Sequence, residues 1–258
     1  MAPFIRGSLR RPWIGGTAGI VLLIGMWWLL TSRMHGNSSF PTPLAVVRSV
    51  FEDGWTFYMR NISSTLGRAA AGYLWGNLIA LTLATIVLAL PHLEEIVAQI
   101  GVVTNCLPIT AVGPLIMVIF GGRTSAIVLS AMLVFFTTLI GSLVGLKSAP
   151  QGTLDLITAY GGSRWTQIRK VRLISAIPSV MAALQVAVPG SILGAIVGEY
   201  LGGIDGGIGV ALNAAQRQIQ PDRVWALSII TGLLSLLGYG LIGLLGRIIT
   251  PWAKEATR

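Results

Sequence analysis

Few residues of this 258-residue chain have the types and spacing that enzyme chemistry requires. His35 and His92 are its two histidines, and the charge pattern described below places them on opposite sides of a membrane, so they do not share a metal ion. Glu94 and Glu95 are adjacent at the edge of an apolar run rather than paired inside one. Cys106 is the only cysteine, which excludes an internal disulfide, and we expect it to be an inert core residue. The sequence therefore predicts no catalytic residue, no bound metal and no enzyme activity.

A glycine-rich stretch from Gly202 to Gly209 is the one segment that suggests phosphate binding. Its spacing fits neither the P-loop pattern nor the dinucleotide-binding pattern, so we expect a flexible turn. No nucleotide-binding loop occurs elsewhere, and this chain is expected to bind no cofactor itself.

Polar side chains inside apolar runs are the remaining candidates for functional residues. They are costly in lipid, so they mark either a solute path or contacts between helices. Most are hydroxyls, whose commoner role is helix packing: Thr82, Thr85, Thr104, Thr110, Thr137, Thr138, Ser142 and Ser191. Arg68 either snorkels outward or meets an anionic solute. Prolines 108, 114 and 189 suit gating segments but also ordinary kinks. The predicted translocation path comprises Arg68, Asn77, Asn105, Pro108, Gln185 and Glu199.

These residues must be positioned by membrane-spanning helices. Hydrophobic residues make up 53% of the chain and charged residues 10%, against about 25% in soluble proteins. The mean hydropathy is +0.77. A helix needs about 20 apolar residues to cross the hydrocarbon core. We expect an all-α integral membrane protein with six transmembrane helices, over Ile14–Ser32, Ser64–Leu90, Ile96–Phe120, Thr124–Leu146, Ala176–Gly198 and Val224–Ile249.

The basic residues predict the orientation of these spans. With the N-terminus inside, the inner segments hold eleven Lys and Arg and the outer segments six, so both termini are expected in the cytoplasm. The net charge of +9 is explained by this bias. Nucleic acid is excluded as a partner, because no basic stripe with interleaved aromatic residues exists.

Phe40-Pro41-Thr42-Pro43, after the first span, is a stiff extended stretch. Apolar residues then recur at helical spacing from Leu44 to Tyr58, which predicts a helix on the membrane surface or on the bundle.

The longest inner loop, from Lys147 to Ser175, has a pattern of its own. Thr153 or Asp155 is expected to cap a short helix with Leu154, Ile157 and Tyr160 on one face. Gly161-Gly162 ends that helix, and Ser163 caps a second one that begins at Arg164-Trp165. This predicts a rigid knob with exposed aromatic residues. Trp165 is either an anchor for a protein partner or a headgroup-belt residue.

Residues Asp155 to Trp165 resemble the "EAA" loop of binding-protein-dependent permeases of type I ABC importers. Asp155 takes the place of the family's Glu, Leu156 and Ile157 those of its two alanines, and Gly161 that of its glycine. Val171 and Leu173-Ile174 take the places of the following Ile and Leu-Pro. Both alanines and the proline are thus replaced.

Other stretches resemble the nitrate/sulfonate/taurine branch of that family. They are Phe40-Pro41-Thr42-Pro43, Leu107-Pro108, Gly113-Pro114-Leu115, Phe120-Gly121, Glu199-Tyr200-Leu201-Gly202 and Gly206-Gly207-Ile208-Gly209. The resemblance covers nearly the whole chain in order.

The resemblance implies a permease subunit in the bacterial inner membrane. One permease type with one coupling loop predicts that it pairs with a second copy of itself, since closed twofold pairing is the commonest symmetry. Two cytoplasmic ATPase subunits, which hold ATP and Mg²⁺, and an extracytoplasmic binding protein complete the importer. It implies a transporter-type domain at 63–250, after an N-terminal part at 1–62 and before a tail at 251–258. The implied coupling residues are Asp155, Ala159, Tyr160, Gly161, Gly162, Ser163, Arg164 and Trp165. The implied cargo is a small polar or anionic solute such as nitrate, a sulfonate or taurine.

Two alternatives remain at this stage. One is an ATP-independent secondary transporter or channel, although inverted repeats and acids at the membrane midplane are not found. The other is an ABC permease for a vitamin or a pyrimidine.

Overall fold

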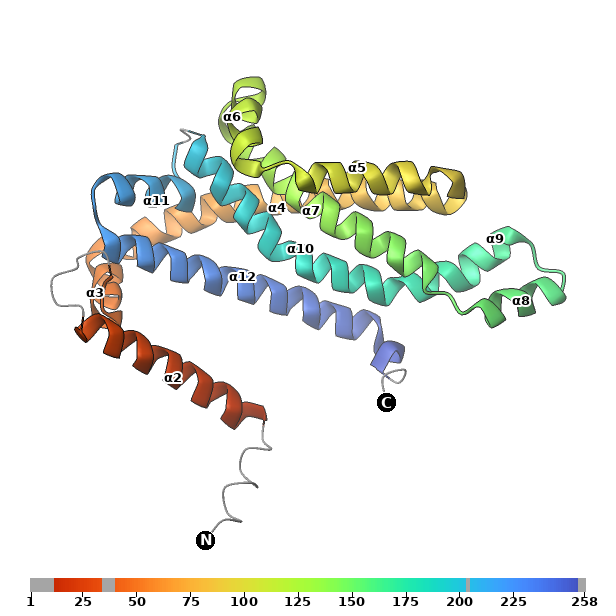
Figure 1. The fold of residues 1–258 in the computed structure, drawn as a ribbon, viewed down its shortest axis with the longest axis horizontal. Helices are drawn as coiled ribbons and strands as arrows, with labels where there is room; N and C mark the ends of the chain where they lie inside the picture. The colour runs from red at the N-terminus through yellow and green to blue at the C-terminus, as the bar shows by residue number, and fades with distance from the viewer. Residues whose placement is uncertain (1–11, 34–39, 203–204, 255–258) are drawn as a thin grey trace, which may run out of the picture.

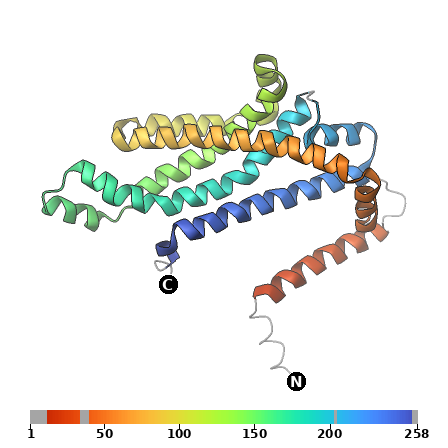
Figure 2. The same cartoon turned by 180° about the vertical axis from the view of Figure 1, so that it is seen from behind.

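The chain folds into long helices that run along one axis, shown from two sides in Figure 1 and Figure 2. The structure is a computed structural model, and it describes residues 12–33, 40–202 and 205–254. No strand occurs among these residues. The long helices are α2 (Pro12–Arg33), α4 (Trp55–Ala89), α7 (Gly122–Lys147), α10 (Leu173–Leu201) and α12 (Pro221–Ile249). Each is long and apolar enough to cross a membrane.

Shorter elements connect the long helices. They are α3 (Pro43–Asp53), η1 (Pro91–Leu93), α5 (Glu94–Cys106), α6 (Ile109–Phe120), α8 (Gln151–Ala159), α9 (Arg164–Gln167), the π-helical turn η2 (Ile168–Arg172), α11 (Ile208–Arg217) and η3 (Pro251–Lys254). We call the end that carries α3 and α11 the outer end, and the end that carries α8 and α9 the inner end (Figure 1).

The prediction of an all-α membrane protein is confirmed, with one correction to the third span. Five single helices of the described residues are long enough to cross a membrane. The expected third span is instead a pair of helices, Pro91–Cys106 and Ile109–Phe120, bent by 96° at the break, which forms either a broken span or a re-entrant loop. Leu107 and Pro108 have extended backbone at the break. Proline lacks an N–H and disfavours helical backbone in the residue before it, which explains why the helix stops there. Pro114 and Pro189, by contrast, lie inside α6 and α10.

The helix predicted over residues 44–58 is shorter than expected. Thr42 caps α3, and Gly54, with a φ of +78°, separates it from α4, which begins nine residues before the predicted start of the second span. The prediction that Cys106 lies in the core is wrong, because this residue is exposed at the end of α5.

Small residues let α4 and α10 pack closely on the two sides of α7. Gly194 and Gly198 of α10 face Ser130 and Ala126 of α7, and an added Cβ would lie 2.5 Å and 2.4 Å from their Cα atoms. Glycines four residues apart are a common device for bringing helix backbones together in membranes. The hydroxyl of Ser130 also donates a 2.8 Å hydrogen bond to the carbonyl oxygen of Ser191. These contacts make α4, α7 and α10 the core of the structure.

Candidate functional sites: an inner knob, an outer joint and a groove

The inner end carries a protruding helix–turn–helix unit, residues 151–172, which we call the knob (Figure 1). The predicted pattern is confirmed: α8 ends before Gly161, whose φ is +72°, and the Ser163 side chain accepts a hydrogen bond from the Thr166 amide. The predicted cap of the first helix is wrong. That helix begins at Gln151, directly after Pro150, without a side-chain cap.

The two helices of the knob are fastened to each other. The side-chain amide of Gln167 donates to the Thr158 hydroxyl at 2.7 Å and to the Leu154 carbonyl oxygen at 3.2 Å. Leu154, Ile168 and Val171 are buried. The π-helical turn η2 continues directly into α10, and Ser148 bonds the Ser175 carbonyl oxygen at the base. The knob is therefore one unit that continues into a core helix.

The outer surface of the knob presents large side chains to solvent. Tyr160 is 85% exposed, Trp165 60% and Leu156 56%. Tyr160 was expected to share a face with Leu154 and Ile157, but it lies just after the helix end and is exposed, whereas Leu154 is buried. Asp155, Ala159 and Arg164 are exposed on the same unit. Exposed Trp and Tyr on a rigid support are the residue types that anchor protein interfaces.

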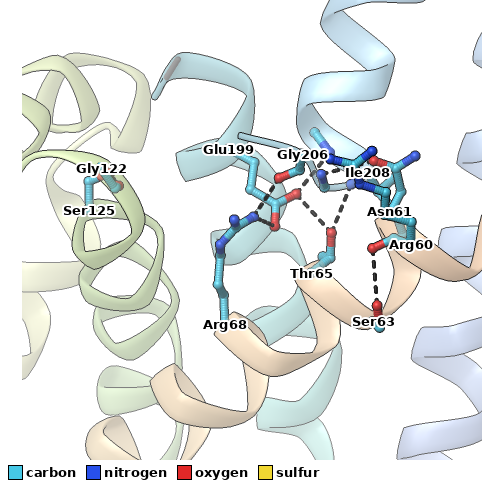
Figure 3. A network of polar contacts seen from close by, with 12 residues as sticks. Arg60, Asn61, Ser63, Thr65, Arg68, Gly122, Ser125, Glu199, Gly206 and Ile208 are labelled. Carbon is cyan, nitrogen blue, oxygen red and sulfur yellow. Dashed lines mark hydrogen bonds and ion pairs between the residues drawn. The ribbon is translucent and has the colours of Figure 1, made fainter. Parts of the chain in front are cut away.

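The outer end holds a closed polar cluster, which Figure 3 shows from close by and which we call the outer joint. Its side chains are Asn61, Thr65 and Arg68 of α4 and Glu199 of α10. Arg68 Nη1 lies 2.7 Å from Glu199 Oε1, and the two side chains are 5% and 0% exposed. Thr65 donates to Glu199 Oε2 at 2.8 Å. A buried carboxylate and a buried guanidinium thus neutralise each other.

The same cluster binds the backbone of the glycine-rich stretch. The Gly207, Ile208 and Gly209 amides donate to Asn61 Oδ1, Thr65 Oγ1 and Glu199 Oε2, at distances of 2.8 to 2.9 Å. Arg68 also donates to the Gly206 carbonyl oxygen at 2.8 Å. This differs from two expectations. Arg68 does not snorkel outward but pairs inward, and residues 206–209 are held by hydrogen bonds rather than forming a flexible turn.

The six residues of the predicted translocation path do not gather at one place. Arg68 and Glu199 belong to the outer joint. Asn77 is buried between α4 and α7, where its side-chain oxygen accepts a 2.5 Å hydrogen bond from Thr138. Asn105 and Pro108 are exposed at the bend between α5 and α6. Only Gln185 lines a large hollow.

That hollow is a groove of about 800 Å³ between α10 and α12. The lining residues are Pro178, Met181, Ala182, Gln185, Tyr239, Gly240, Gly243, Leu244, Gly246, Arg247 and Thr250. Gln185 lies against Gly243, where an added Cβ would be 2.4 Å from its amide nitrogen. Tyr239 and Arg247 lie one turn either side of Gly243 on α12. The sequence analysis counted Arg247 among the eleven inner Lys and Arg residues and did not identify Tyr239 or Gly243. Their spacing of four residues and the glycines between them are the signal that could have revealed a shared face.

A family model for "Binding-protein-dependent transport system inner membrane component" matches residues 63–251. The formylaminopyrimidine transport permease protein of Halalkalibacterium halodurans is 25% identical over 91% of this chain and 94% of the relative. The riboflavin transport system permease protein of Chloroflexus aurantiacus is 27% identical over 98% of this chain and 96% of the relative. The taurine transport system permease protein of Escherichia coli is 24% identical over 92% of this chain and 88% of the relative.

Proposed function

We propose that two copies of this chain form the membrane path of an importer for a small polar or anionic solute. The premise is that the chain belongs to the family of binding-protein-dependent transport system inner membrane components. The chain is a multi-pass inner-membrane protein and an ABC importer permease. Members of this family are generally non-catalytic subunits. Hydrolysis of ATP, with its Mg²⁺, is assigned to two separate cytoplasmic ATPase subunits.

The knob is the observation that carries this proposal. Its exposed Tyr160 and Trp165 are suited to bind a cleft on the ATPase, and its continuity with α10 gives a mechanical route into the core. A movement of the ATPase that displaced the knob would displace the inner end of α10 with it. The proposed coupling residues are Asp155, Ala159, Tyr160, Gly161, Gly162, Ser163, Arg164 and Trp165.

The proposed orientation places both termini and the knob in the cytoplasm, with a substrate-binding protein at the outer end. The positive-inside bias supports it. Labelling of a Gly152→Cys variant by a membrane-impermeant thiol reagent tests it, because this knob position is exposed and an added Cβ there has no atom within 4 Å. Because Cys106 is exposed, the variant is made in a Cys106→Ser background. The reagent is expected to label inverted vesicles but not intact cells. Labelling of intact cells would indicate the opposite orientation.

The groove is the best candidate for the part of the path that this chain contributes. Gln185 offers a side-chain amide, and Arg247, at the inner end of the same groove, offers a guanidinium for an anion. Because the named relatives carry a pyrimidine, riboflavin and taurine, the cargo is tested with a panel. Uptake of taurine or nitrate supports the proposed solute class, whereas uptake of riboflavin or formylaminopyrimidine alone assigns the chain to a vitamin or pyrimidine importer.

Two matched glycine variants test the coupling role. Gly161→Val places a β-branched residue at a φ of +72°, which strains the turn, whereas Gly152→Val lies in α8 with no atom within 4 Å of the added Cβ. The ATPase is expected to co-purify with wild type and Gly152→Val but not with Gly161→Val. Equal recovery of the ATPase with all three proteins would overturn the coupling role.

A further inference from the structure

The outer joint supplies α11 with the cap that its own sequence lacks. The first amide groups of a helix have no partner within the helix. At α11 no side chain of the element caps them. The acceptors come instead from Asn61 and Thr65 on α4 and from Glu199 on α10. The carboxylate of Glu199 also lies at the positive end of the α11 dipole, which favours a negative charge.

The start of α11 packs directly against α10, without space for an added side chain at Gly207 or Gly209. A Cβ on Gly207 would lie 2.4 Å from the Glu199 carboxylate, and a Cβ on Gly209 would lie 2.2 Å from the Ile196 carbonyl oxygen. Separating α11 from α4 and α10 would leave the buried amides of residues 207–209 without acceptors and would take one donor from the Glu199 carboxylate and one acceptor from the Arg68 guanidinium. Separating α4 from α10 would leave the Arg68 and Glu199 charges without each other. A buried charge without its partner is strongly unfavourable, so the joint is either fully formed or broken at high cost.

The interface between α10 and α12 at the inner end is built differently. The groove separates the two helices there, and the glycines of α12 leave its surface open. The side chain of Gln185 against Gly243 and that of Met181 against Gly246 are contacts without a buried charge. A change in the width of this groove would leave no buried ion unpaired.

We propose that Arg68 and Glu199 are positioning residues that keep α11 fixed to α4 and α10 throughout the transport cycle. The three helices then move as one body, and the helix displacement that accompanies ATP hydrolysis occurs at the α10–α12 groove. This inference rests on the proposed function, because it needs an ATPase to drive the movement.

Two cross-links in the complete complex with its ATPase test this division. In a Cys106→Ser background, Tyr200→Cys with Gln216→Cys joins α10 to α11 on the exposed side of the joint, where the two native side chains are hydrogen bonded at 2.5 Å. Gln185→Cys with Gly243→Cys joins α10 to α12 across the groove. Each pair is bridged with a short bis-methanethiosulfonate, and ATP hydrolysis is measured in proteoliposomes before bridging, after bridging and after reduction.

We expect the 200–216 bridge to leave the hydrolysis rate within about twofold of the unbridged protein. The 185–243 bridge is expected to lower the rate at least tenfold, and reduction is expected to restore it. Loss of hydrolysis with the 200–216 bridge would show that α11 must leave α10, which overturns the proposal. Full hydrolysis with the 185–243 bridge would equally overturn it, because the groove would then not be the moving interface. Failure of the ATPase to co-purify with the unbridged protein would instead contradict the proposed function.

Discussion

The outer joint and the inner knob use polar and aromatic residues in opposite ways. In the joint, every charge is buried and paired within the chain, so that Glu199 is 0% exposed. In the knob, Trp165 and Tyr160 are held on a firm support but left 60% and 85% exposed. A buried ion pair with hydrogen-bonded neighbours favours one rigid arrangement, whereas exposed anchors on a rigid base are available to bind a second surface. The comparison indicates that the charges of the joint are paired within the chain, whereas the aromatic residues of the knob are available to a partner.

The largest expected effect is at the joint itself. Glu199→Ala leaves Arg68 buried without its counter-ion and removes an acceptor from the α11 amides. We expect the free energy of unfolding to fall by about 3–5 kcal/mol, measured by thermal unfolding of the purified protein in detergent. A double variant, Arg68→Met with Glu199→Ala, is expected to recover part of the loss because no unpaired charge stays buried. A double variant less stable than Glu199→Ala would contradict this reading of the joint.

The next effect is at the knob, and it concerns binding rather than stability. Trp165→Ala is expected to weaken binding of the ATPase about 5- to 150-fold, or about 1–3 kcal/mol, if the indole is a buried anchor in the complex. The unfolding temperature of the permease alone is expected to stay unchanged, since the indole is exposed. Titration of the purified ATPase measures the affinity, and Thr153→Ala, an exposed change on the same knob, is the control. Unaltered affinity would favour the headgroup-belt interpretation of Trp165.

A smaller effect is expected at Asn77, between the two ends. Its side chain joins α4 to α7 through Thr138, so Asn77→Ala is expected to cost about 1 kcal/mol of stability. A double-mutant cycle with Thr138→Val isolates the coupling between the two side chains. If transport falls while the unfolding temperature is unchanged, Asn77 belongs to the path rather than to the helix contact.

The smallest effect is expected at an exposed ion pair of the outer end. Arg48 and Glu52 of α3 lie 2.7 Å apart, with side chains 78% and 62% exposed. Glu52→Ala is expected to change the free energy of unfolding by only about 0.3–0.5 kcal/mol, because solvent screens the pair. Comparing the loss of unfolding free energy in Glu52→Ala with that in Glu199→Ala shows whether the joint is stable because its ion pair is buried or simply because an ion pair is present. Equal losses in the two variants would remove that distinction.

The sequence by itself determined the features that depend on neighbours along the chain. Hydropathy gave the spans, because a crossing helix needs a continuous apolar run. Gly161 and Ser163 predicted the turn and the cap of the knob, since both depend on a few adjacent residues. The position of the break at Leu107-Pro108 was readable as a proline that interrupts a helix, but its 96° angle was not, because packing of α5 and α6 on the core sets that angle.

Only the tertiary structure decided which polar residues meet. Arg68 and Glu199 are 131 residues apart, and each one alone is an unexplained charge near a span. Their pairing depends on the direct contact between α4 and α10, which both also pack against α7. Gln185 and Gly243 meet only because α12 returns alongside α10. Side chains brought together by helix packing leave no local pattern, so the joint and the groove emerge from the fold rather than from any single stretch of sequence.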